Sequence, residues 1–191
     1  MIYRRGRYVM KKFEEKTIQS ELKFKGRIIT LQVDEVELPN GKTSNREIVK
    51  HPGAVAVIAV TKDNKIILVE QFRKALERSI IEIPAGKIEI GEAPEITALR
   101  ELEEETGYTT DNLQYIQSFS TSPGFADEII HLYFADNIVK MEQPVGLDED
   151  EFVELLHVSL TQMEEMVKKQ QIYDAKTAFA YIWLKDYFKE A

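Results

Sequence analysis

Alternating and continuous apolar positions predict that the chain is mostly β-strand before residue 86. The strand segments share β-branched or apolar side chains, either at period two or in short runs, and they end at Gly, Pro or Asn. They are 17–38 (two strands that turn near Gly26), 46–51, 53–60, 66–73 and 79–86, the last ending at Pro84 and Gly86. The Asn-Gly pair within 39–42 tolerates positive φ and therefore predicts a hairpin turn.

The rest of the chain alternates between helix and strand patterns. One acidic helix is expected after residue 93, and strands and two further helices follow it. The predicted strands are 113–121, 128–135 and 152–160, and the two helices are 160–170, capped by Ser159 or Thr161, and 174–188, capped by Asp174.

The change from a strand unit to a mixed pattern of strands and helices predicts a domain boundary near residue 50. Residues 1–50 form an N-terminal strand unit, and residues 51–191 form a mixed α/β domain. Because the first unit has too little apolar surface for a core of its own, we expect it to mediate a homodimer. Met10 is an alternative start, which would make residues 1–9 an upstream extension.

Composition narrows the functional classes. The chain has 25 basic and 33 acidic residues and a net charge of −8, which argues against a general nucleic-acid binder. The absence of cysteine excludes disulfides, thiolate catalysis and zinc–thiolate sites, and fits a cytoplasmic protein. No apolar run approaches the roughly 20 residues of a membrane helix, so no membrane association is expected.

The segment 86–108 concentrates negative charge on a short helix. Pro94 suits a first turn and Gly107 suits a stop, which predicts a helix over about 94–106. An apolar arc (Ile96, Ala98, Leu99, Leu102) and an acidic arc (Glu101, Glu104, Glu105) are expected on it, and Arg100 should pair with Glu104.

Like charges at this spacing near a helix C-terminus are locally unfavourable. The acidic arc is therefore either a solvated face or a site for a divalent cation. Carboxylates without Cys or paired His suit Mg²⁺ or Mn²⁺ rather than zinc, and the spacing alone leaves both interpretations open.

The wider pattern resembles the Nudix box. From Gly86 there are five residues, Glu92, seven residues, Arg100-Glu101-Leu102, one residue, Glu104-Glu105, one residue, and Gly107-Tyr108. The resemblance extends over about residues 45–160. It implies an α/β/α sandwich around a mixed sheet and the metal-dependent hydrolysis of a nucleoside diphosphate linked to another group.

The segment 121–128 (Thr-Ser-Pro-Gly-Phe-Ala-Asp-Glu) and the N-terminal strand unit resemble the ADP-ribose pyrophosphatases of this family. This subgroup implies cleavage of ADP-ribose to AMP and ribose 5-phosphate, with Mg²⁺ (or Mn²⁺) as cofactor and two chains in a homodimer. Two alternatives are another Nudix substrate, such as a nucleotide sugar or dinucleoside polyphosphate, and a non-catalytic ADP-ribose sensor.

The resemblance also assigns roles to individual residues. For catalysis it indicates Glu149 as the base, with Arg100 and Glu104, and for the metal it indicates the carbonyl of Ala85, Glu101, Glu105 and Glu151. For substrate binding it indicates Arg27, Ile28, Arg46, Glu47, Arg73, Glu82, Lys87, Ser122, Gly124 and Glu128. A structural salt bridge is the alternative for Arg73, and a solvated acidic loop is the alternative for Glu149 and Glu151.

Overall fold

The computed structural model describes residues 11–146 and 152–190, and the chain divides into two compact units. The first unit extends to His51 and includes Ser122–Asp127. The second unit comprises Pro52–Thr121 and the chain from Glu128 onward. The segment Ser122–Asp127 therefore belongs to the first unit, although it lies between two strands of the second.

The first unit is a three-stranded antiparallel sheet in the order β1 (Lys16–Lys25), β2 (Thr30–Glu37) and β3 (Thr43–Lys50), preceded by the short helix η1 (Lys11–Phe13). These are the strands that the sequence predicts. The β2–β3 hairpin turns at Gly41, whose φ is +79°, as expected for the Asn-Gly pair. The segment Ser122–Asp127 joins β3 through a hydrogen bond from Val49 N to Phe125 O of 2.7 Å.

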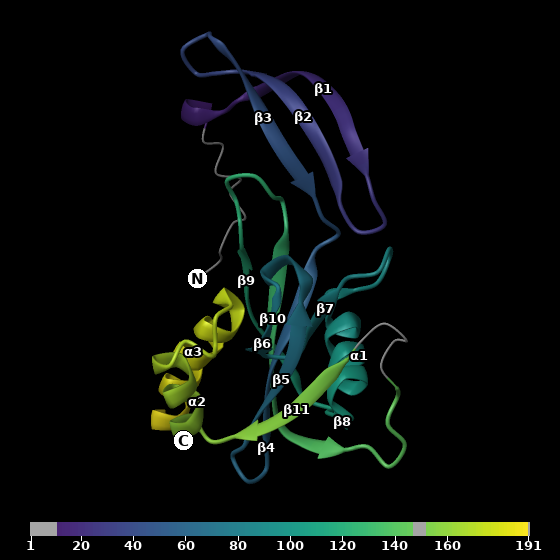
Figure 1. The fold of residues 1–191 in the computed structure, drawn as a ribbon, viewed down its shortest axis with the longest axis vertical. Coiled ribbons are helices and arrows are strands. Elements are labelled where there is room, and N and C mark those ends of the chain that lie inside the picture. Colours follow the sequence, from purple (N-terminus) through teal and green to yellow (C-terminus); the bar gives the residue numbers. More distant parts are fainter. Residues whose placement is uncertain (1–10, 147–151, 191) are drawn as a thin grey trace, which may run out of the picture. The chain divides into compact units, whose positions relative to one another are not determined.

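The second unit is an α/β/α sandwich around a mixed sheet, which confirms the predicted fold class (Figure 1). Strands β4 and β10 pair in parallel, and the other strand pairs of the unit are antiparallel. The strands are β4 (Ala54–Thr61), β5 (Ile66–Arg73), β6 (Arg78–Glu82), β7 (Ala85–Lys87), β8 (Tyr108–Thr109), β9 (Leu113–Ser120), β10 (Ile129–Lys140) and β11 (Val153–Val158), and the helices are η2 (Lys74–Leu76), α1 (Pro94–Thr106), α2 (Leu160–Lys168) and α3 (Ala175–Glu190).

Alternate residues of β4 supply the two layers of the core, because successive side chains of a strand point to opposite faces. Val55, Val57 and Ala59 pack in the cluster that contains Ala98 and Leu102 of α1. Ala56, Ile58 and Val60 pack in the cluster of α2 and α3, which includes Met163, Ala180 and Leu184. Helix α1 thus covers one face of the sheet, and α2 and α3 cover the other (Figure 1).

The prediction of one strand over 79–86 is wrong, because the segment forms two strands. Strand β6 pairs with β5, whereas β7 pairs with β4. The break falls at Pro84, which has no N–H to continue a ladder, and its carbonyl accepts a hydrogen bond from Val57 N at 2.9 Å. The chain therefore changes partner strand at Pro84, and this change brings Ala85 and Gly86 next to α1.

The predicted helix starts and the predicted end of α1 are confirmed, whereas α2 ends at Lys168 rather than 170 and α3 extends to Glu190 rather than 188. Helix α1 spans Pro94–Thr106 and is capped by Gly107, whose φ is +68° and whose N–H donates to the carbonyl of Glu103. Ser159 caps α2, and Asp174 accepts a hydrogen bond from Thr177 N at the start of α3. One detail is wrong, since Ile96 is 56% exposed and does not join the apolar arc of α1.

In the described ranges, 11–146 and 152–190, no helix is long and apolar enough to cross a membrane.

Candidate functional site

Two carboxylates of α1 converge on the backbone of β7. Oε2 of Glu105 accepts a hydrogen bond from Ala85 N at 2.9 Å. The carboxyl group of Glu101 lies directly against Gly86, since a Cβ built on that glycine would be only 1.9 Å from Cδ of Glu101. Both glutamates are only 8% exposed. Gly86 is therefore required because a side chain there would occupy the space that the Glu101 carboxylate fills.

Arg100 holds the neighbouring acidic side chains in place. Its Nη1 lies 2.7 Å from Oε2 of Glu104 and 3.0 Å from Oε1 of Glu101, and its Nη2 lies 3.2 Å from Oε2 of Glu92. The predicted pair with Glu104 is confirmed. Burial disfavours the charged guanidinium, but hydrogen bonds from it to Glu92 and Glu104 outweigh this and raise the pKa of Arg100.

Glu92 braces the loop before α1. It accepts hydrogen bonds from Arg100 and, at 2.7 Å, from the hydroxyl of Thr97. These bonds, with that from Arg100 the larger cause, lower the pKa of Glu92. The carboxylate is therefore kept ionised, and it ties the loop to the first turns of the helix.

The donor set around β7 fits a hard divalent cation through Glu101 and Glu105, with the Ala85 carbonyl as a further oxygen donor. The atoms nearest to the space over Gly86 all belong to the carboxyl group of Glu101. Within residues 11–146 and 152–190, no group of three or more Asp, Glu or His side chains is arranged to hold a metal ion. Arg100 engages Glu104, and the carboxylates of Glu101 and Glu105 meet at this backbone.

A second cluster lies at the ends of β5 and β6. Nε and Nη2 of Arg73 donate to the two carboxylate oxygens of Glu82 at 2.7 and 2.8 Å, so the salt bridge considered as the alternative for Arg73 is present. Burial opposes ionisation of Glu82, but Arg73 and Lys176 outweigh it and lower the pKa of Glu82. The pKa of Arg73 is raised, first by the hydrogen bond to Glu82, with smaller contributions that include the charge of Glu105.

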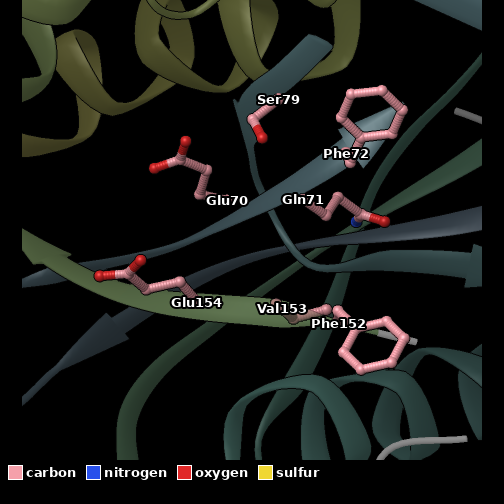
Figure 2. Close-up of a pocket in the computed structure, with 7 residues that line it drawn as sticks. All are labelled: Glu70, Gln71, Phe72, Ser79, Phe152, Val153 and Glu154. Atoms are coloured by element: carbon pink, nitrogen blue, oxygen red, sulfur yellow. The ribbon is translucent and has the colours of Figure 1, made fainter. Parts of the chain in front are cut away.

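A cavity of about 490 Å³ opens at β5, β6 and β11. That volume is in the range of small-molecule sites. Figure 2 shows the rings of Phe72 and Phe152 at one end of it, with the amide of Gln71 between them. The cavity is lined by Glu70, Gln71, Phe72, Ser79, Phe152, Val153 and Glu154. None of these residues was predicted from the sequence.

The predicted residues of the first unit have local partners or are exposed. Arg27 and Ile28 lie exposed in the β1–β2 turn, and Glu47 is exposed on β3. Arg46 donates from Nε and Nη2 to Glu15 at 2.8 and 2.6 Å. Ser122 and Gly124 belong to the segment Ser122–Asp127, in which the Ser122 carbonyl accepts hydrogen bonds from the N–H groups of Phe125 and Ala126.

The remaining predicted residues are placed as follows. Lys87 is exposed on β7, and Glu128 accepts a hydrogen bond from the hydroxyl of Thr121 at 2.6 Å. Glu149 and Glu151 lie outside the described residues. The structure thus groups Ala85, Arg100, Glu101, Glu104 and Glu105 in one cluster, and Arg73 and Glu82 in another.

Three residues of the second cluster were not predicted as site residues. Lys176 contacts Glu82, Asp174 contacts Lys176, and Thr177 joins Asp174 to the backbone of Ile83. The sequence of the last helix does indicate this contact, because Lys176 precedes Ala180 by four residues and therefore begins an apolar stripe of the helix. A lysine on a buried stripe needs a buried anion as its partner.

Comparison with known proteins gives matches over most of the chain. The NUDIX domain family matches residues 50–179, and the nucleoside diphosphate sugar hydrolase N-terminal domain matches residues 15–49. A methanol dehydrogenase activator of Bacillus methanolicus is 61% identical over 92% of this chain and 95% of its own. An ADP-ribose pyrophosphatase of Bacillus subtilis (strain 168) is 60% identical over 93% of this chain and 97% of its own.

The crystal structure of an ADP compounds hydrolase shares the fold. It superimposes with a TM-score of 0.81 at 20% identity, and the match covers 93% of this chain and 95% of that one.

Proposed function

We propose that this chain, which belongs to the Nudix family, hydrolyses the pyrophosphate of ADP-ribose to AMP and ribose 5-phosphate. The observation that carries the hydrolase chemistry is the convergence of Glu101 and Glu105 on the backbone of Ala85 and Gly86. The substrate is supported by the 60% identity to an ADP-ribose pyrophosphatase over nearly the full length of both chains.

Nudix hydrolases generally use divalent metals, and the oxygen donors at β7 favour Mg²⁺ or Mn²⁺ here. When bound by Glu101, Glu105 and the Ala85 carbonyl, the cation would neutralise charge on the pyrophosphate oxygens. The chain's own contribution is to prepare the donors. Arg100 orients Glu101 from one side, and the N–H of Ala85 fixes Glu105 from the other.

Arg73 is the cation of this unit that we propose for phosphate binding. Glu82 accepts hydrogen bonds from Nε and Nη2 of Arg73, and the Arg73 side chain is 40% exposed. A guanidinium held in this way presents its remaining edge in a fixed direction, which suits recognition of a phosphate oxygen.

Proton removal from the attacking water is assigned to Glu149, with Glu151 as an outer metal ligand; both assignments are predictions from the sequence. A positioned general base typically contributes about 10²–10⁴-fold. Glu149→Gln should therefore lower kcat by about that factor with little change in KM, and Glu151→Gln should cost less.

The decisive experiment is a substrate comparison with the purified protein in Mg²⁺. ADP-ribose should give AMP and ribose 5-phosphate with a higher kcat/KM than an ADP-sugar, a GDP-sugar or a dinucleoside polyphosphate. In ¹⁸O-water the label should enter AMP, because attack is expected at the adenosyl phosphorus. A higher kcat/KM for a sugar nucleotide would contradict the substrate, and label in ribose 5-phosphate would contradict the site of attack.

A second candidate function is activation of another enzyme. It is favoured by the 61% identity to a methanol dehydrogenase activator over 92% of the chain. The test is to add the protein to a methanol dehydrogenase and measure alcohol oxidation, with a Glu105→Gln variant as the control. A rate increase with the native protein but not with the Glu105→Gln variant would link activation to hydrolysis. No increase with either protein would exclude this function for that dehydrogenase.

Homodimerisation through the N-terminal strand unit is the proposed assembly. Strand β1 is exposed along its whole length, and its apolar residues Ile18, Leu22 and Phe24 are each at least 55% exposed. Apolar side chains gathered on an exposed strand typically mark an interface. The cysteine-free composition supports a cytoplasmic location for the dimer.

A further inference from the structure

Lys176, in the first turn of α3, is a buried lysine that the proposed reaction does not use. The residue is 9% exposed, and it shares a helix stripe with Ala180 and Leu184, both fully buried. Its Nζ donates to Oε2 of Glu82 and lies 3.2 Å from Oδ1 of Asp174. Since burying an ammonium group is costly unless it is paired, these two carboxylates account for its position.

Glu82 is shared between two cations of different exposure. Its Oε1 accepts from Nε of Arg73, and its Oε2 accepts from both Nη2 of Arg73 and Nζ of Lys176. Glu82 is 1% exposed, whereas the Arg73 side chain is 40% exposed. The carboxylate therefore links an inner cation, Lys176, to an outer one, Arg73.

The first turn of α3, which carries Lys176, is fixed to the sheet by hydrogen bonds. Oδ1 and Oδ2 of Asp174 accept hydrogen bonds from the N–H and the hydroxyl of Thr177 at 3.1 and 2.5 Å. The same hydroxyl accepts a hydrogen bond from Ile83 N at 2.9 Å. The first turn of α3 is thus fastened to the residue that follows Glu82, so Lys176 approaches Glu82 from a defined direction.

We propose that Lys176 is a positioning residue for Arg73. Lys176 fixes the carboxylate of Glu82, and Glu82 in turn fixes the guanidinium so that its Nη1 edge meets a phosphate oxygen of the substrate. The inference rests on the proposed function, in which Arg73 binds the pyrophosphate. Without the ammonium, Glu82 and Arg73 can rotate together, and the outer edge of Arg73 loses its fixed direction.

The test compares Lys176→Met, Lys176→Arg and Lys185→Met by steady-state kinetics with ADP-ribose. Lys185 is the matched control, because it is an exposed lysine of the same helix. Lys176→Met should raise KM by about 10-fold and change kcat by less than about 3-fold. Lys176→Arg, which keeps a cation beside Glu82, should restore most of the native KM, and Lys185→Met should behave as the native protein.

A double variant separates positioning from a general loss of structure. In an Arg73→Gln background, Lys176→Met should raise KM no further, because its effect passes through Arg73. Loss of folded protein would instead lower the apparent kcat in both backgrounds and leave KM unchanged. An unchanged KM in Lys176→Met, or a KM rise that persists in full without Arg73, would overturn the proposal.

A measurement that needs no substrate tests the positioning role of Lys176 independently of the proposed function. The Nε–H proton of Arg73, bonded to Glu82 in the native protein, should exchange faster with water in Lys176→Met or in the milder Lys176→Gln. An unchanged exchange rate in both variants would overturn the positioning role whatever the substrate is. Failure of the native protein to cleave ADP-ribose would remove the proposed function and leave this measurement decisive.

Discussion

Replacing Gly86 by alanine should disable the site by displacing one carboxylate. The added Cβ would lie 1.9 Å from Cδ of Glu101 and 2.0 and 2.2 Å from its two oxygens. Ordinary contact begins at 3.4 Å, so the carboxyl group has to move by about 1.5 Å. Because a misplacement of about 1 Å can cost about 10²-fold in rate, kcat for AMP release should fall by about 100-fold or more.

The same substitution has a measurable cost in stability. The backbone at Gly86 does not adopt positive φ, so alanine adds no conformational strain there. Overpacking typically costs about 1–3 kcal/mol, and the free energy of unfolding in urea should fall by that amount. A Glu101→Ala background removes the three atoms nearest to the added methyl group, so the cost should disappear there.

Two results would refute this reasoning. If Gly86→Ala kept the native kcat and free energy of unfolding, the position of Glu101 would not depend on the close approach. If the stability cost were the same with and without the Glu101 side chain, the methyl group would be clashing with something else.

Other predictions concern the acidic site, the exposed strand and the buried pair. Glu105→Gln should lower kcat by about 100-fold and leave the circular dichroism spectrum unchanged. EDTA should abolish the activity of the native protein, and Mg²⁺ or Mn²⁺ should restore it. Full activity of Glu105→Gln without metal would contradict the metal-binding role of Glu105. Light scattering should give about twice the 22.1 kDa chain mass for the native protein, and Leu22→Lys should shift it towards the monomer; a native monomer with full activity would count against the dimer. Since the folded-state pKa of Glu82 is lowered, its stabilisation is complete above the unfolded pKa of about 4.3 and is lost as the pH falls through the folded value. At pH 7, Glu82→Gln should lower the free energy of unfolding in urea by about 3 kcal/mol, and this difference should shrink below about pH 4. A difference that stays constant with pH would contradict the role of the ionised Glu82.

Local signals in the sequence predicted most of the elements. Pro94 and Gly107 mark the two ends of α1, and Ser159 and Asp174 begin the last two helices. These signals work because a cap is satisfied within one helical turn, so nothing distant is needed to recognise it. The convergence of Glu101 and Glu105 was also predictable in part, since residues four apart share a helix face.

Features that depend on distant partners were not predicted. The strand over 79–86 was expected to continue, but Pro84 moves the chain from β5 to β4, and the sequence does not show which strands are neighbours. Lys176 and Glu82 are 94 residues apart, so their contact exists only once α3 packs on the sheet. The cavity at β5 could not be predicted for the same reason, because Phe152 and Phe72 line one cavity only through the pairing of β11 with β5.

The carboxylates of the acidic helix have partners within the chain, so we expect the protein to fold without a bound metal ion. Like charges four residues apart cost a few tenths of a kcal/mol per pair (roughly 0.2–0.5), and here each carboxylate has a partner within the chain. Arg100 contacts Glu101 and Glu104, and Ala85 N donates to Glu105. We therefore expect the free energy of unfolding in urea to be nearly the same in EDTA as in a buffer without chelator, even though EDTA abolishes activity. A large loss of stability in EDTA would mean that the cation, rather than Arg100 and the backbone of β7, holds the carboxylates together.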